Sequence, residues 1–168
     1  MFNRGLFVLG VVLEICFGGA FLQAAADDPL FLVKNGSQQK TYKLSEMKQK
    51  FKVRKGKVYC PECKAMLDYE AFALEDLLKA NGFKFDETNL ILRCKDGYAP
   101  VITPKKIKDL KVLLAFHDKN SKDGLPTIKK GEVSTYTGPF FVITPKSESY
   151  KEFGWPYQVV SVETLENH

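Results

Sequence analysis

Short apolar runs separated by turn-forming residues dominate the sequence and limit it to a fold built largely from strands. The runs lie at residues 30–33, 90–92, 101–103, 112–116, 140–144 and 157–162. Asn35-Gly36, Asp96-Gly97 and Pro104 follow three of them, as expected where a strand enters a turn. We therefore predict an α+β, mostly β, domain with six or so short strands and one or two helices at its edge.

Helical signals are confined to a few segments. Residues 72–80 are the clearest helix, because their leucines share one face and Asn81-Gly82 provides a stop. A shorter helix is expected over residues 46–51, with Ser45 as its N-cap.

Two polar segments are not expected to form central strands of a sheet. Residues 53–59 alternate, but their lysines and arginine indicate an exposed hairpin. Residues 119–136 are polar and contain two glycines and a proline, which predicts a long functional or mobile loop.

The first 26 residues have the features of an export signal. Arg4 precedes an almost wholly apolar run over residues 6–22, which only Glu14 interrupts, and small residues lead up to Ala26. We predict cleavage near Ala26, a single domain over residues 27–168, and a periplasmic or secreted protein. The alternative is an uncleaved signal that holds the domain at a membrane.

The charge distribution favours some partners over others. The net charge is +5, and the lysines are scattered rather than interleaved with aromatic residues. This pattern is typical of a solvated surface, so we predict no nucleic-acid binding. An acidic redox partner or an anionic substrate is compatible with the charge.

The cysteines are the sharpest chemical signal. Of the four in the chain, Cys16 lies in the predicted signal, so Cys60, Cys63 and Cys94 remain in an oxidising compartment. Cys60-Pro61-Glu62-Cys63 has three interpretations: a redox disulfide or dithiol, half of a zinc or copper site completed by Cys94 and His117, or a local disulfide that stabilises a turn.

Cys94 and His117 also have simpler explanations. Cys94 ends an apolar run and is expected to be a small buried hydrophobic residue, although Arg93 and Lys95 would lower its pKa if it were exposed. His117 follows an apolar run and is expected to be hydrogen-bonded at the end of a strand. No hydrolase or kinase motif is present.

Five segments together carry a resemblance to a known family. They are residues 69–78, 96–98, 113–116, 138–143 and 155–160. Their order and spacing resemble the sulfite-oxidase-type molybdopterin-binding oxidoreductase domain, and above all the small exported members that carry only the core of that fold. The likeness covers roughly residues 40–165.

The resemblance implies a mixed α+β fold with a curved sheet system and a cysteine thiolate that ligates molybdenum. Cys60 is close to the position of that cysteine, and Cys63 is the second candidate. A soft thiolate suits such a metal, and ligation would hold the sulfur deprotonated.

The resemblance also implies a ligand cavity. Asp96 and Tyr98 resemble the turn that lines it, and we expect Arg54 and Trp155 to contribute to it as well. Trp155-Pro156-Tyr157 is otherwise a packing element that forms a pocket wall or a partner surface.

The chain departs from the catalytic members of the family. They are longer, and they hold the pterin with arginine, histidine and asparagine residues. The predicted mature chain has only two arginines, Arg54 and Arg93, and two histidines, His117 and His168. Ala71 also replaces the family's glycine before the helix. We therefore expect no bound pterin, because few polar groups remain to hold its phosphate.

These observations leave two classes of function. The first is an exported accessory or binding module of a periplasmic electron-transfer system, with a partner such as a cytochrome. The alternative is a genuine molybdenum-dependent oxidoreductase with Cys60 or Cys63 as the metal ligand, and a thiol site for zinc or copper lies between the two.

Overall fold

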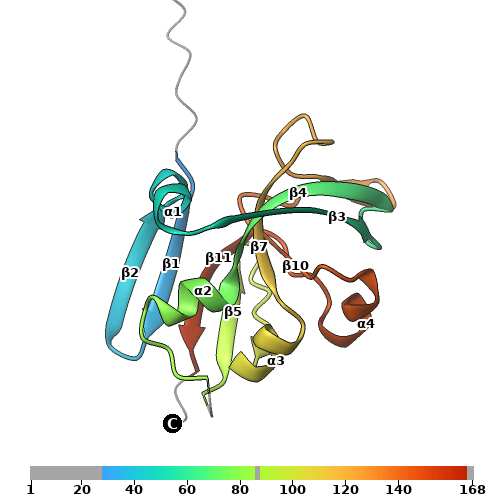
Figure 1. The fold of residues 1–168 in the computed structure, drawn as a ribbon. Helices are drawn as coiled ribbons and strands as arrows, with labels where there is room; N and C mark the ends of the chain where they lie inside the picture. Colours follow the sequence, from blue (N-terminus) through green and yellow to red (C-terminus); the bar gives the residue numbers. More distant parts are fainter. Residues whose placement is uncertain (1–27, 86–87, 166–168) are drawn as a thin grey trace, which may run out of the picture.

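The computed structural model describes residues 28–85 and 88–165 (Figure 1). In these ranges the chain forms two sheets, a separate hairpin and several short helices. The helices are α1 (Leu44–Lys50), α2 (Leu74–Lys79), α3 (Pro104–Asp109), the 3-10 helix η1 (Ser147–Ser149) and α4 (Tyr150–Phe153).

The larger sheet has the strand order β2-β1-β11-β5-β6. Its members are β1 (Leu30–Asn35), β2 (Gln38–Lys43), β5 (Leu90–Cys94), β6 (Val101–Ile102) and β11 (Val159–Thr164). β1 and β11 run parallel, and the other neighbours run antiparallel. Along β1, Phe31 and Val33 face the core, whereas Leu30 and Leu32 point to the opposite face because side chains alternate along a strand.

The smaller sheet has the order β10-β7-β4-β3, and all its neighbours are antiparallel. It consists of β3 (Val53–Cys60), β4 (Ala65–Ala73), β7 (Leu113–Asp118) and β10 (Phe141–Ile143), while β8 (Thr127–Lys130) and β9 (Val133–Tyr136) pair with each other as a separate hairpin. β10 and most of β7 are buried on both faces, which explains why they are continuous apolar runs rather than alternating ones.

Two apolar cores lie on opposite faces of the smaller sheet. The larger core joins both sheets and the helices through aromatic contacts, such as Phe31 with Phe140 at 5.2 Å and Phe72 stacked on Phe116 at 4.7 Å between ring centroids. The second core lies under the turn between β3 and β4 and includes Trp155. The smaller sheet thereby positions the β3–β4 turn near the segment that contains Tyr150 and Trp155.

The predicted α+β, mostly β, fold class is confirmed. The helix expected over residues 72–80 is present as α2, and Gly82 beyond it adopts a left-handed φ of 73°. Residues 53–59 are on the edge of the sheet, as expected, but they form one continuous strand, β3, rather than a hairpin of their own. The turn of the hairpin with β4 lies beyond them, between Cys60 and Ala65.

Other local features also differ from the expectations. β4 was not predicted, because its charged residues obscure the apolar side that faces the second core. Residues 119–136 are not one loop, since β8 and β9 lie within them. Ser45 is not the N-cap of α1, because the helix begins earlier, after Lys43, and the Ser45 hydroxyl donates to Asp28 instead.

The predicted signal peptide over residues 1–26 lies outside the described residues. In the described part of the chain, no helix is long and apolar enough to cross a membrane.

Candidate functional site

Cys60 and Cys63 form a disulfide across the turn between β3 and β4. Their Cα atoms are 5.2 Å apart, and Lys64 closes the turn with a left-handed φ of 51°. Cys60 is 0% exposed in the second core, whereas Cys63 is only partly buried. The backbone N–H of Cys63 donates to Cys60 Sγ at 3.0 Å. The two sulfurs of one disulfide therefore have different surroundings.

Glu62, inside the disulfide turn, connects it to two distant segments. Tyr150 of α4 donates its hydroxyl hydrogen bond to Glu62 Oε1, and Lys130 Nζ of β8 lies 3.6 Å from Glu62 Oε2. Burial, and then the hydrogen bond and negative charge of Glu62, raise the pKa of Tyr150 to about 12. The turn is thus linked to the hairpin and to α4 through one carboxylate.

A cavity of about 360 Å³ lies beside this turn, and we call it the disulfide cavity. It is lined by Glu62, Asp96, Tyr98, Lys130, Tyr150, Gly154, Trp155, Pro156 and Tyr157. Three of the four side chains predicted to line a ligand cavity meet here, although they come from segments far apart in the sequence.

The three predicted residues of the disulfide cavity are held in different ways. Asp96 Oδ1 accepts a hydrogen bond from the N–H of Tyr98 at 3.0 Å, which stabilises the turn between β5 and β6. The ring of Tyr98 is 55% exposed at the rim. Trp155 is only 4% exposed, and its Nε1 donates to Thr144 Oγ1 at 3.2 Å. The cavity therefore has a fixed wall at Trp155 and an accessible one at Tyr98.

Arg54, the fourth predicted residue, lines a different depression, beside α2. Its guanidinium forms an ion pair with Asp76 at 3.2 Å between Nη2 and Oδ2. Arg54 lies near the start of the continuous strand β3, at the opposite end from the disulfide turn, and its ion pair depends on how β3 packs beside α2.

Cys94 and His117 lie apart from the disulfide turn. Cys94 is a free thiol, 6% exposed, in the larger core, and burial raises its pKa to about 12 despite the flanking basic residues. His117 of β7 lies opposite Glu70 of β4 in the register of the sheet. Its Nδ1 is buried without a hydrogen-bond partner in the described part of the chain. Across residues 28–85 and 88–165, no three His, Cys, Asp or Glu side chains gather as a metal site would require, so the proposed Cys60, Cys63, Cys94 and His117 set is not assembled.

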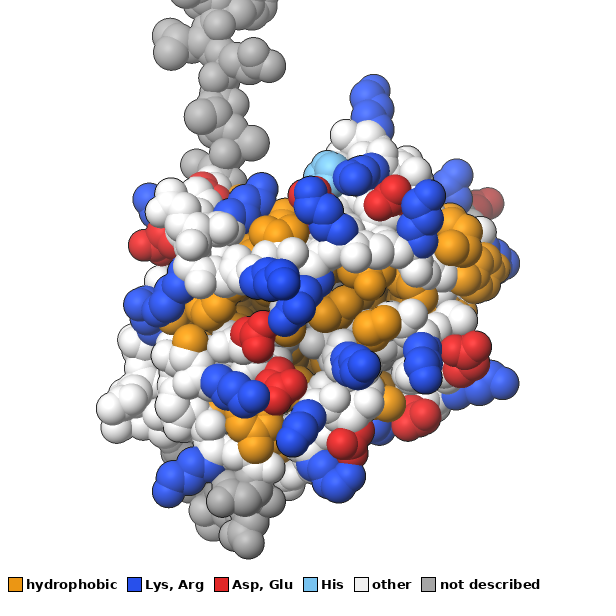
Figure 2. Space-filling model, in the orientation of Figure 1, with side chains coloured by type: hydrophobic (Ala, Val, Ile, Leu, Met, Phe, Trp, Pro, Cys, Tyr) orange, Lys and Arg blue, Asp and Glu red, His pale blue; other side chains and the backbone are white. Residues whose placement is uncertain are grey.

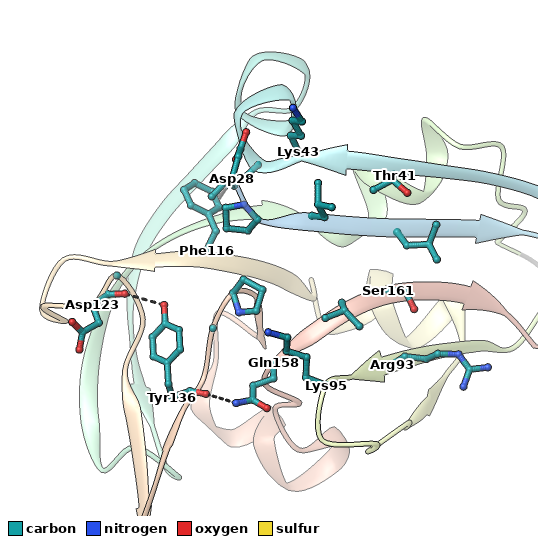
Figure 3. A pocket seen from close by; sticks show the side chains of 18 of the residues that line it. Asp28, Thr41, Lys43, Arg93, Lys95, Phe116, Asp123, Tyr136, Gln158 and Ser161 are labelled. Atoms are coloured by element: carbon teal, nitrogen blue, oxygen red, sulfur yellow. Dashed lines mark hydrogen bonds between the residues drawn. The ribbon is translucent and has the colours of Figure 1, made fainter. Parts of the chain in front are cut away.

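A second, larger concavity of about 1110 Å³ covers the outer face of the larger sheet (Figure 3). Thr41, Leu32, Ser161 and Arg93 form one row across four strands of its floor. One end is closed by Tyr136, whose backbone carbonyl accepts a hydrogen bond from the Gln158 side chain at 2.8 Å. This groove was not predicted, because its floor combines strands that are distant in the chain.

The charges around the groove are mixed. The groove is lined by three basic side chains, Lys43, Arg93 and Lys95, and by three acidic ones, Asp28, Asp123 and Glu163. Arg93 forms an ion pair with Glu163, with 3.0 Å between Nε and Oε2. The groove thus offers no concentrated charge of either sign.

Molybdopterin would need a thiolate for its metal and cationic groups for its phosphate. No cysteine of the described residues lines the disulfide cavity, and the two sulfurs of the adjoining turn are bonded to each other. The lining places Glu62 and Asp96 against a single Lys130. Two carboxylates repel a dianionic phosphate, so this set of side chains does not fit the pterin.

The family resemblance has no support from comparison with known proteins. No protein-family model matches the chain, and no curated protein matches it. The functional assignment therefore depends on the side chains of the disulfide cavity.

Three polar side chains of this site were not predicted. Glu62 was available as a signal, because it lies inside the Cys-x-x-Cys motif. Lys130 and Tyr150 lie in polar segments without any motif, and only the packing of β8 and α4 brings them to Glu62.

Proposed function

We propose that this chain is an exported accessory or binding module of a periplasmic electron-transfer system, with a sulfite-oxidase-like core and no pterin of its own. One observation carries the proposal. One cavity is lined by Glu62 of the disulfide turn, by Asp96 and Tyr98 of the β5–β6 turn, and by Trp155. The β5–β6 turn and the segment with Trp155 are two of the segments that carry the family resemblance.

The lining of the cavity supports recognition rather than a metal-centred reaction. Tyr98, Tyr157 and Trp155 provide aromatic surface, and Glu62, Asp96 and Lys130 provide a few polar groups. This mixture is typical of ligand sites and of the centres of protein interfaces.

The charge of the chain supports an acidic partner. The net charge is +5, and lysine and arginine side chains are spread over the face drawn in Figure 2. These cations outside the cavity, rather than the cavity with its two carboxylates, attract an acidic electron-transfer protein, such as an acidic cytochrome, and the attraction weakens as salt screens it.

The cofactor part of the proposal is tested by producing the full chain in an exporting host supplied with molybdate. Metal content is measured by mass spectrometry, and free thiols are counted. We expect no stoichiometric molybdenum, with Cys94 as the free thiol of the domain. Stoichiometric molybdenum would overturn the proposal in favour of an oxidoreductase, and zinc or copper with protected thiols would indicate a thiol metal site.

The binding part is tested with an acidic cytochrome as the probe and Trp155, the only tryptophan, as the reporter. We expect saturable quenching of its fluorescence that weakens at high salt and is reduced by Tyr98→Ser. Val101→Ser is the matched control, because Val101 is 52% exposed but does not line the cavity. Quenching that Tyr98→Ser and Val101→Ser affect equally would contradict binding at the cavity.

A further inference from the structure

We propose that the Cys60–Cys63 disulfide exchanges with a dithiol of a partner protein, with Cys63 as the sulfur that is attacked and Cys60 as the leaving thiolate. This inference rests on the proposed function, because the exchange takes place at the disulfide turn that borders the proposed binding cavity. It adds a chemical activity, thiol–disulfide exchange, and an order of events to that function.

The difference in burial decides which sulfur is attacked. An attacking thiolate must reach the sulfur along the S–S axis, so access controls the choice. Cys60 is 0% exposed and packs in the second core with Val58 and Leu67. Cys63 also packs against this core, but it is only partly buried and lies in the turn itself. An incoming thiolate therefore reaches Cys63 and not Cys60.

The hydrogen bond at Cys60 favours the same direction. The N–H of Cys63 points at Cys60 Sγ at 3.0 Å. A donor held at this position stabilises negative charge that develops on Cys60 when the disulfide breaks. The rest of its environment is apolar, so the buried thiolate remains costly and returns readily to attack the mixed disulfide.

The reaction balances as a two-electron exchange. A thiolate of the partner bonds to Cys63 Sγ, and the Cys60–Cys63 bond breaks with its electron pair remaining on Cys60. The second partner thiolate then attacks the partner's own sulfur in the mixed disulfide and releases Cys63 as a thiolate. The partner dithiol is oxidised to a disulfide, and the two protons that it gives up protonate Cys60 and Cys63.

Glu62 links the redox state of the turn to the cavity. It lies between the two cysteines and holds both the Tyr150 hydroxyl and Lys130. Tyr150 in turn packs against Trp155, with 6.0 Å between ring centroids. Opening the disulfide frees the turn that carries Glu62, so the fluorescence of Trp155 should report reduction.

The test uses the full chain and two single variants, Cys60→Ser and Cys63→Ser, with oxidised glutathione as the probe. Peptide mapping by mass spectrometry locates the adduct on each cysteine. We expect one adduct on Cys63 in folded Cys60→Ser, formed at least tenfold faster than any adduct on Cys60 in folded Cys63→Ser. Cys94 is the internal control, because this buried thiol should not react until the protein is unfolded.

A second measurement does not depend on a folded variant. Dithiothreitol is added to the wild-type chain, and Trp155 fluorescence, circular dichroism and free thiols are followed together. We expect two new thiols and a fluorescence change while the circular dichroism stays native. Resistance of the disulfide until the fold is lost would show a purely structural crosslink and overturn the inference, as would equal reactivity of Cys60 and Cys63.

The two proposals fail in different ways. If exchange fails but the acidic cytochrome still quenches Trp155 in a Tyr98-dependent way, only the exchange is wrong. If exchange occurs but stoichiometric molybdenum is also present, the accessory function is wrong and the thiol chemistry stands.

Discussion

Tyr150 connects the disulfide turn to Trp155. Its hydroxyl donates to Glu62, 88 positions earlier, and its ring packs on Trp155. The ordinary pKa of a tyrosine is 10.0, and burial together with Glu62 raises that of Tyr150 to about 12. The neutral form is therefore favoured in the folded state. Its contribution to stability is complete below pH 10.0 and is lost as the pH rises through about 12.

Substitution of Glu62→Gln should lower the pKa of Tyr150, because the negative charge beside the hydroxyl is removed. The pKa should stay above that of an ordinary tyrosine, since burial, the largest cause of the shift, remains. The measurement is an ultraviolet titration of tyrosinate, with Tyr150→Phe used to subtract the other tyrosines. An unchanged midpoint in Glu62→Gln would show that the two side chains are not coupled.

At the scale of elements, one carboxylate organises the segment that leaves β7. Asp118 is 2% exposed and accepts hydrogen bonds from the N–H of Asp68 at 2.8 Å, the N–H of Asn120 at 3.2 Å and the hydroxyl of Ser121 at 2.7 Å. These bonds tie the end of β7 to β4 and start the path to the β8–β9 hairpin, which carries Lys130 to the disulfide cavity.

Substitution of Asp118→Ala should lower the free energy of unfolding by roughly 2–4 kcal/mol, because three donors lose a charged acceptor in a buried position. Asp123→Ala is the matched control in the same loop, since Asp123 is exposed and its change should stay within about 0.5 kcal/mol. Chemical denaturation of both variants gives the comparison. Equal losses would mean that Asp118 does not organise the loop.

The elements also show where local patterns are sufficient. β1 and β5 were recognised because an apolar run and a Gly-containing turn are both local signals. β4 was missed because Asp68 and Glu70 make the segment look polar. In the fold they form ion pairs with Lys57 and Lys55 of the neighbouring β3, and the other neighbour, β7, follows only after α2, β5, β6 and α3. Because β4 was not recognised, its last residues, Phe72 and Ala73, were assigned to the helix that follows.

At the scale of the whole molecule, the larger core contains side chains from both sheets, so neither sheet can lose its packing alone. Phe31 of β1 contacts Phe140, next to β10, and Phe72 of β4 stacks on Phe116 of β7. The second core lies on the other face of the smaller sheet and shares β4, β7 and β10 with it. The two cores are therefore expected to unfold together.

Denaturant unfolding should accordingly be a single transition. Circular dichroism reports both sheets, and Trp155 reports the second core, so the two midpoints should coincide if the disulfide is kept oxidised. A fluorescence midpoint at a lower denaturant concentration would show that the second core and the disulfide turn open before the rest of the fold.

The sequence by itself determined the mostly β class, the position of α2 and several turns, because apolar runs and Gly-containing stops act over a few residues. Only the tertiary structure decided which side chains share the site. It placed Tyr98 and Trp155 beside Glu62 and sent Arg54 to the depression beside α2. It also buried Cys94, as the apolar run before it predicted, deeply enough that its basic neighbours do not activate it. These outcomes depend on contacts across tens of residues and on desolvation, and neither quantity is encoded in any short segment of the chain.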